Sequence, residues 1–419
     1  MRSIINNYYV KLRSTNILSN FFNLSSIQVS NILLLVITIR IITGRYGIET
    51  YGLVSVAYTF LMLAGTVISY GTTQSGVRDT AYHINEPEKL SLVIYNALGI
   101  RVIIFMLFCL ALSAYYWFDP DHYNYLWFAL PLAMAEVFNP LCFYIGVEKV
   151  KIFNLFNLIA NFFAVAAIFI LVRGTNNAVW VNFILGTANV ITYVGLFVYL
   201  HKRFRLQFYL PSAIDLIAIS RANFSLTLNN ISANLQQSVI FFALGFFNSP
   251  LLGAYSLSNR VIGQCRNAFN IVSNAVYPKA VAIYKLSEEQ WMGFRKKMKN
   301  IFGRIALGGA LIIFAMADLI VFILTKQHDP DTILILRVMA FVPIISAYNV
   351  FSMLDLLLKQ KRRNIFNIGV VLIAVAVIIA FLSAYSENIY LIGAFTIFIE
   401  GTAWLMYEYV INKTKNKNA

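Results

Sequence analysis

The chain has 419 residues, of which 59% are hydrophobic and 12% are charged, yet its formal net charge is +15. An ordinary soluble protein carries about 25% charged residues, so this composition excludes a soluble globule of this size. The basic residues also do not predict nucleic-acid binding, because they occur in small clusters between long uncharged runs and form no basic face. The composition is that of a membrane protein.

Six runs contain no Lys, Arg, Asp or Glu, and each can hold at least one membrane-crossing helix of about 20 residues. They are residues 14–39, 50–77, 152–172, 174–201, 222–259 and 364–386. Segments interrupted by one ionisable residue bring the total to about twelve predicted spans. Their centres lie near Asn31, Leu61, Met106, Leu132, Phe163, Asn189, Ala233, Ala268, Ile313, Met339, Ala374 and Phe398. We therefore expect an all-α polytopic membrane protein.

Basic residues are divided unequally between the two sets of connections. The set that includes the N-terminus contains 25 Lys and Arg, and the opposite set contains 4. Cytoplasmic loops are enriched in these residues, so both termini are predicted to be cytoplasmic, which requires an even number of spans. The connections are short, and we expect no soluble domain.

The two halves of the sequence repeat each other. Gly52 begins the segment Gly-Leu-Val-Ser, and Gly253 begins Gly-Ala-Tyr-Ser 201 residues later. Pro131 early in the fourth span matches Pro343 in the tenth, at an offset of 212. Because spacing and topology agree, we expect two six-helix bundles in the same orientation. The predicted bundles are residues 1–205 and 206–419.

Three segments carry motifs of a known family. Residues 39–81 contain a Gly-x-x-x-Tyr-Gly-Leu turn and, further on, Tyr-Gly followed by Gly-Val-Arg-Asp. Residues 143–151 read Phe-Tyr-Ile-Gly-Val-Glu-Lys-Val-Lys, and residues 253–279 open with Gly-x-Tyr-Ser and close with Tyr-Pro-Lys. Together they resemble the polysaccharide-export flippases, the Wzx-like group of the multidrug/oligosaccharidyl-lipid/polysaccharide (MOP) exporter superfamily. Arg78 and Asp79 in the first motif form either a gate contact or a plain loop ion pair.

This resemblance implies two six-helix lobes in a V-shaped, MATE-like architecture. It also implies alternating access that moves an undecaprenyl-diphosphate-linked oligosaccharide, such as an O-antigen, capsule or exopolysaccharide unit, across the bacterial cytoplasmic membrane. The implied partners are this lipid-linked oligosaccharide, membrane lipids and glycan polymerase or export machinery, and no nucleic acid. No cofactor is expected, although a proton or sodium gradient is a candidate driving force.

Polar side chains form stripes on three predicted helices. The stripe on the seventh is Asn223, Thr227, Asn230, Asn234 and Gln237, whose steps of 4, 3, 4 and 3 place them on one face. The eighth carries Ser256, Asn259, Gly263, Arg266, Asn270 and Tyr277, and the first carries Asn16, Asn20, Asn23 and Ser30. Such stripes avoid lipid and face either neighbouring helices or a wet cavity. For whole stripes we favour the cavity.

Arginines inside spans are the candidate contacts for an anionic cargo, because a guanidinium donates forked hydrogen bonds to a diphosphate. Arg266 is the first choice and Arg260 the second, while Arg40, Arg101 and Arg337 are expected to extend towards lipid head groups. The predicted substrate-binding set is Arg266, Arg260, Asn230, Asn234, Gln237 and Asn270.

Three carboxylates within spans, Glu136, Asp318 and Glu400, are candidates for ion coupling, since a buried carboxylate can exchange a proton or sodium ion. The alternative is an arginine–carboxylate pair that locks two helices. Asp355 is interpreted as a charge at the inner end of a span. The four histidines lie near loops, and no metal site is predicted.

Two other functions fit the sequence less well. A MATE-type multidrug/cation antiporter is expected to have a cavity dominated by carboxylates, whereas this interior has arginine and amide residues. A membrane enzyme such as a glycan polymerase requires paired carboxylates or a large outer loop, and the sequence shows neither. We therefore expect a transporter and not an enzyme.

Overall fold

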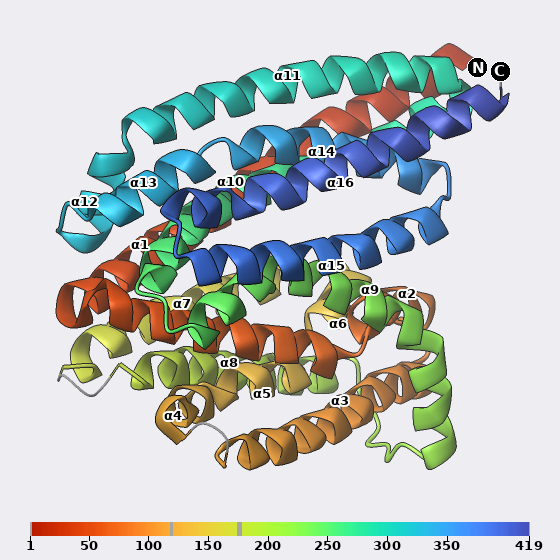
Figure 1. Ribbon diagram of the computed structural model, residues 1–419. Coiled ribbons are helices and arrows are strands. Elements are labelled where there is room, and N and C mark those ends of the chain that lie inside the picture. Colours follow the sequence, from red (N-terminus) through yellow and green to blue (C-terminus); the bar gives the residue numbers. More distant parts are fainter. Residues whose placement is uncertain (1, 118–119, 174–177, 419) are drawn as a thin grey trace.

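The computed structural model describes residues 2–117, 120–173 and 178–418, without the side chains of 2–31, 121–122, 270–275, 277–278, 362 and 414–418. Within these ranges every regular element is a helix (Figure 1), which confirms the all-α prediction. The helices are α1 (Arg2–Ser69), α2 (Thr72–Tyr82), α3 (Pro87–Tyr115), α4 (Pro120–Phe128), α5 (Leu130–Phe138), α6 (Leu141–Gly146), α7 (Val150–Leu171), α8 (Trp180–Arg203), α9 (Ala213–Phe246), α10 (Leu251–Leu286), α11 (Glu288–Ala315), α12 (Ala317–Thr325), α13 (Pro330–Met339), α14 (Val342–Leu358), α15 (Arg362–Ser386) and α16 (Ile389–Asn418).

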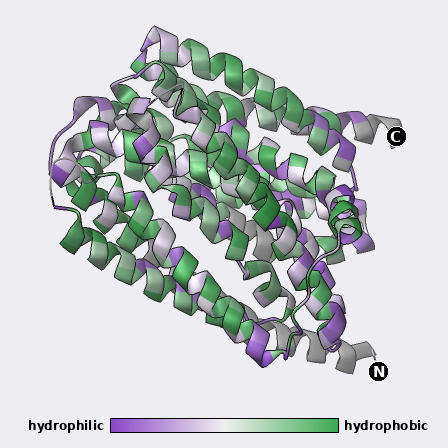
Figure 2. Cartoon of the chain, turned by 90° about the horizontal axis from the view of Figure 1, so that it is seen from below, coloured by the Kyte–Doolittle hydropathy of each residue, from purple (hydrophilic) through white to green (hydrophobic). Residues whose placement is uncertain are grey.

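The predicted number of spans agrees with these helices. Nine helical segments of the described chain are long and apolar enough to cross a membrane. One of them, Ile32–Ser69, contains a bend at Gly47 (φ 82°, ψ 173°), so α1 runs out and back as two arms. The polar helices α9 and α10 are not among the nine, because amide-rich faces lower their hydropathy. With these two and the second arm of α1, the described residues contain twelve long helical segments, in agreement with the prediction of about twelve spans. Figure 2 shows the long apolar stretches along the outer helices.

Several predicted spans are broken into shorter helices. Pro131 and Pro343, which the repeat matches, each lie in the first turn of a helix that follows a break, α5 and α14 respectively. Proline fits this position because the backbone N–H that it lacks has no helical partner there. A second break at Asn139 and Pro140 separates α5 from α6. The breaks free backbone carbonyls inside the bundle, and these need other donors.

Apolar packing changes partners at the connection between α8 and α9. The buried residues of two clusters, around Leu61 and Tyr144, all precede α9. The buried residues of three other clusters, which include Tyr255, Leu356 and Trp291, all lie after the start of α9. A sixth cluster combines residues of α1, α7 and α8 with residues of α10 and α12. Helix α1 therefore packs on helices that precede α9 and on helices that follow its start. The predicted division into two bundles at residues 205 and 206 stays a prediction.

The bend of α1 packs against the start of α10, at the end of the molecule opposite the two termini (Figure 1). A Cβ atom on Gly253 would lie 2.0 Å from the carbonyl oxygen of Ile48, and one on Gly52 would lie 2.8 Å from the backbone nitrogen of Gly253. Only glycine permits so close an approach of two backbones. The two glycines that begin the repeated segments therefore contact each other and close this end.

A second contact joins α2 to α9. Gly71 has a positive φ of 66° before α2, and a Cβ atom on it would lie 3.1 Å from the carbonyl oxygen of Asn223. One turn along, the side-chain amides of Gln74 and Asn230 exchange two hydrogen bonds of 2.9 and 3.0 Å. Arg78 pairs with the adjacent Asp79 at 2.7 Å on the exposed side of α2, which agrees with the plain ion pair.

Candidate functional site

A large cavity lies among the second arm of α1 and helices α9, α10, α14, α15 and α16. Its volume is about 1010 Å³. Amides are frequent in its described wall: Asn229, Asn230, Asn234, Gln236, Gln237, Asn259, Gln264, Asn267 and Asn349. An amide both donates and accepts hydrogen bonds, so this wall can bind hydroxyl groups without carrying charge.

Five of the six residues predicted to bind substrate line this cavity: Arg260, Arg266, Asn230, Asn234 and Gln237. The sixth, Asn270, lies outside the described side chains, as does the polar stripe predicted on the first span. The stripe of the seventh span divides into two parts. Its inner members Asn223 and Thr227 are buried and pack on Gly71, so they serve helix contact, whereas the three residues that follow face the cavity.

Arg266 forms an ion pair inside the cavity. Its Nη2 lies 2.5 Å from Oε1 of Glu400 on α16, and its Nη1 donates weakly to Gln237 at 3.4 Å. The second carboxylate oxygen of Glu400 accepts a hydrogen bond of 2.6 Å from Asn349 on α14. The positive charge of Arg266 is therefore compensated, and Glu400 agrees with the alternative of a helix-locking pair.

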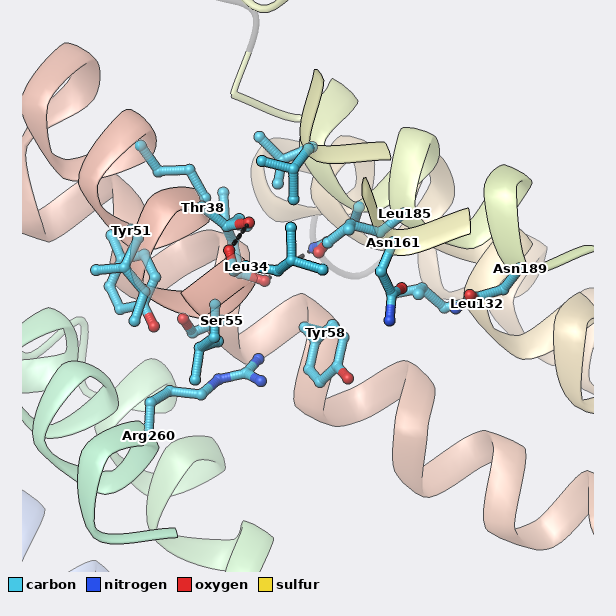
Figure 3. A pocket seen from close by; sticks show the side chains of 17 residues that line it. Leu34, Thr38, Tyr51, Ser55, Tyr58, Leu132, Asn161, Leu185, Asn189 and Arg260 are labelled. Atoms are coloured by element: carbon cyan, nitrogen blue, oxygen red, sulfur yellow. Dashed lines mark hydrogen bonds between the residues drawn. The ribbon is translucent and has the colours of Figure 1, made fainter. Parts of the chain in front are cut away.

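Arg260 is the described cavity cation without a carboxylate partner. Its guanidinium lies over the ring of Tyr58, 4.2 Å from the centroid, and no described acidic group pairs with it. A cation–π contact of this kind holds the side chain but leaves its charge available to an anion. Figure 3 shows Arg260 reaching from α10 towards Tyr58 and Ser55 of α1, at the boundary with a smaller cavity. Among the described lining residues the charges are Arg260, Arg266 and Glu400, so the wall has one positive charge in excess.

A family model described as "Polysaccharide biosynthesis protein" matches residues 17–284, well over half of the chain. The chain belongs to this polysaccharide biosynthesis protein family. A curated relative, the "Putative O-antigen transporter" of Escherichia coli (strain K12), is 19% identical over 368 residues, covering 84% of this chain and 86% of that protein. These findings confirm the resemblance to the Wzx-like group of the MOP superfamily.

Solved structures of other membrane transporters share the fold of this chain. An inward-facing MATE family multidrug transporter of the MOP superfamily superimposes with a TM-score of 0.74 at 14% identity, over 92% of this chain and 96% of that one. The lipid II flippase MurJ, in an inward closed conformation, gives 0.74 at 10% identity, over 92% and 87%. The relatives and structural neighbours are thus transporters or flippases, and the chain is a multi-pass membrane protein with the MOP-superfamily fold.

The other two carboxylates predicted to couple ions, Glu136 and Asp318, lie outside the described lining of the large cavity. Glu136 accepts a 3.0 Å hydrogen bond from Asn139. Asp318 lies at the end of its span and is not buried, which differs from the buried carboxylate considered for coupling, and its coupling role stays a prediction. Its side chain is 49% exposed and lies 2.6 Å from His328, because a short break before α12 places it at a helix end.

The expectation that Arg101 extends to lipid head groups is wrong. Arg101 is 2% exposed and donates to Thr72 Oγ1 at 2.8 Å and to the carbonyl oxygen of Asn139 at 2.8 Å. It therefore satisfies a carbonyl freed by the break between α5 and α6. Arg40 donates at 3.0 Å to the carbonyl of Ile323.

Sequence reasoning missed a buried charge cluster between α11, α14 and α16. Asp355, interpreted as an inner-end charge, is fully buried, 3.5 Å from Lys359 and 3.9 Å from Arg295. Arg295 and Lys299, counted as residues of a connection, lie on α11 and both pair with Glu408 of α16. Burial acts to lower the pKa of Lys359, yet the nearby carboxylates hold it above its usual range. The missed signal is the spacing of Arg295 and Lys299 on one face of a helix.

Proposed function

We propose that this protein is a flippase that moves an oligosaccharide linked to an isoprenoid diphosphate, such as undecaprenyl diphosphate, across the bacterial cytoplasmic membrane. The observation that carries the proposal is the cavity wall, in which one uncompensated arginine, Arg260, lies among many amides. Arginine suits a diphosphate, and amides suit the hydroxyl groups of sugars. The name of the curated relative supports an O-antigen unit as the cargo, and a capsule or exopolysaccharide unit is the alternative.

The same charges disfavour the multidrug/cation antiporter. A cationic drug needs a free carboxylate, and the carboxylate of the described cavity wall, Glu400, is held by Arg266. An organic cation that enters this cavity would instead be repelled by the one excess positive charge of the described wall. We therefore propose a transporter of anionic lipid-linked glycans and not an enzyme acting on them.

The proposed cycle is alternating access between lobes 1–205 and 206–419, with the contact of Gly52 and Gly253 closing one end. The 25-to-4 division of basic residues supports cytoplasmic termini, and both termini lie at one end of the molecule (Figure 1). The partners proposed for this cycle are the lipid-linked oligosaccharide, membrane lipids and the glycan polymerase or export machinery that takes the product.

A flipping assay with purified protein tests this function. Liposomes would contain an isoprenyl-diphosphate-linked oligosaccharide labelled on its sugar, and an external glycosidase would remove the label. With the protein present we expect the enzyme to reach all of the labelled lipid, and without it only the outer leaflet. If the protein leaves the protected pool unchanged but moves an organic cation between compartments, the antiporter function replaces the proposed one.

As the coupling carboxylate for a proton or sodium gradient we propose Glu400, which can bind the ion once a bound anion draws Arg266 away from it, with Glu136 as the second candidate. Glu400→Gln keeps the side-chain volume and the contact with Asn349 but removes the charge that competes for Arg266. We expect this variant to bind inorganic pyrophosphate several-fold more tightly, since a second guanidinium becomes available. Flipping by the variant should no longer respond to an imposed ion gradient.

Isothermal titration in detergent measures the affinity, and the liposome assay with and without a gradient measures the coupling. Glu387→Gln, an exposed substitution beyond the end of α15, is the matched control. Unchanged pyrophosphate affinity in Glu400→Gln would show that the pair does not compete with an anion.

A further inference from the structure

The smaller cavity beside Arg260 has a volume of about 200 Å³ and lies between both arms of α1 and helices α5, α7, α8 and α10. This is the liquid volume of roughly six or seven waters at ~30 Å³ each, the size class of one pyranose ring. Its polar lining residues are Thr38, Tyr51, Ser55, Tyr58, Asn161, Asn182, Asn189 and Arg260. The remaining described lining is aliphatic.

One buried hydroxyl in this cavity makes no well-formed hydrogen bond. Tyr51 is 4% exposed, and the polar groups beside its hydroxyl are Ser55 and Arg260. A buried hydroxyl without a well-formed hydrogen bond is unfavourable, so a ligand or water that bonds to it is stabilised. Asn182 uses its amide nitrogen on the carbonyl of Val54 at 2.8 Å, which leaves its side-chain oxygen as an acceptor.

Figure 3 shows Asn161 and Asn189 at the far side of the cavity from Tyr51, on α7 and α8. Amide and hydroxyl groups on opposite walls, with aliphatic side chains between them, suit a ring that has hydroxyls at its edge and apolar faces. A free cation or anion gains less here, because the described lining contains no carboxylate and its one charge, Arg260, lies at the boundary.

Arg260 and Tyr58 line both cavities. A diphosphate held by Arg260 would therefore have its sugar ester next to the smaller cavity. We propose that this cavity is a monosaccharide subsite, which takes the sugar attached directly to the diphosphate while the rest of the glycan stays among the amides of the large cavity. This inference rests on the proposed function and adds a determinant of which first sugar is accepted.

Two ligands separate the parts of this site: a short isoprenyl diphosphate carrying one hexose, and the same isoprenyl diphosphate without sugar. Tyr51→Phe removes one hydroxyl that makes no well-formed hydrogen bond, and Arg260 keeps its contact with Tyr58, so we expect thermal stability to be retained. Affinity for the hexose-bearing ligand should fall about threefold to tenfold, the effect of one hydrogen bond, while affinity for the sugar-free ligand stays unchanged. Asn161→Leu and Asn189→Leu should show the same selective loss.

Asn412→Leu, which is exposed near the end of α16 and lies outside the lining of both cavities, is the matched control and should bind both ligands as the wild-type protein does. Equal losses for both ligands, or no loss for either, in the Tyr51 and Asn161 variants would overturn the subsite and indicate a structural or water-filled cavity. Failure of the wild-type protein to bind either ligand would instead reject the proposed function, so the two outcomes are distinguishable.

Discussion

Replacing Arg260 by alanine is expected to abolish flipping, with a loss of at least about 100-fold in rate, while the protein still inserts into the membrane. Hydrogen bonds to a charged group contribute about 1.5–3 kcal/mol each, and a guanidinium makes at least two to a diphosphate. No described carboxylate depends on Arg260 for its partner, so its removal leaves no buried charge uncompensated. The liposome assay and the amount of surface glycan in cells lacking their own flippase measure the effect.

Arg260→Lys is the second variant to test, because lysine keeps the positive charge but cannot donate the two parallel hydrogen bonds of a guanidinium. We expect this variant to retain a small part of the activity. Arg173→Ala, exposed beyond the end of α7, should flip at the wild-type rate. A fully active Arg260→Ala protein would remove the basis of the proposed cargo site.

Replacing Asp355 by alanine is expected to destabilise the protein by about 3 to 5 kcal/mol, the range for removing one partner of a buried ion pair. Asp355 is fully buried and accepts a 2.5 Å hydrogen bond from Trp291 Nε1 in addition to its contacts with Arg295 and Lys359. Its loss leaves two cations and an indole N–H without this acceptor. The thermal midpoint of the purified protein in detergent measures the effect.

Asp355→Asn keeps an acceptor for Trp291 and removes only the charge, so we expect a smaller loss of stability. Glu289→Ala, exposed in the first turn of α11, should leave the midpoint unchanged. A wild-type midpoint for Asp355→Ala would show that the cluster contributes nothing to packing of α11 on α14.

The polar stripe of α9 could be predicted because helical spacing is local. Asn230, Asn234 and Gln237 recur at steps of 4 and 3, and lipid excludes such a face, so both the helix and the cavity follow from the sequence. The ranking of the arginines could not be predicted. Whether Arg266 or Arg260 is free depends on Glu400, which lies 134 residues from Arg266 and reaches it only after α16 packs on α10.

The number of spans could be predicted from the apolar runs of the sequence. The positions at which helices break inside these spans could not be predicted from those runs. The break at Asn139 is one of these, and Arg101 serves it by donating to its carbonyl oxygen. Read alone, Arg101 near the end of an apolar run looks like a residue that extends to the head groups. Asp355 presents the same difficulty, because its burial is decided by α11, which follows a different connection.

The ion pair of Arg266 and Glu400 has a consequence for the response of this transporter to voltage. With those two charges cancelled, the described wall of the empty cavity carries the one positive charge of Arg260, while a bound diphosphate reverses the sign of the site. A membrane potential acts on each charge that crosses it with about 2.3 kcal/mol per 100 mV. With the cell interior negative, the field would assist the loaded site as it turns outward and the empty site as it returns. The resting potential would then drive both halves of the proposed cycle in the export direction.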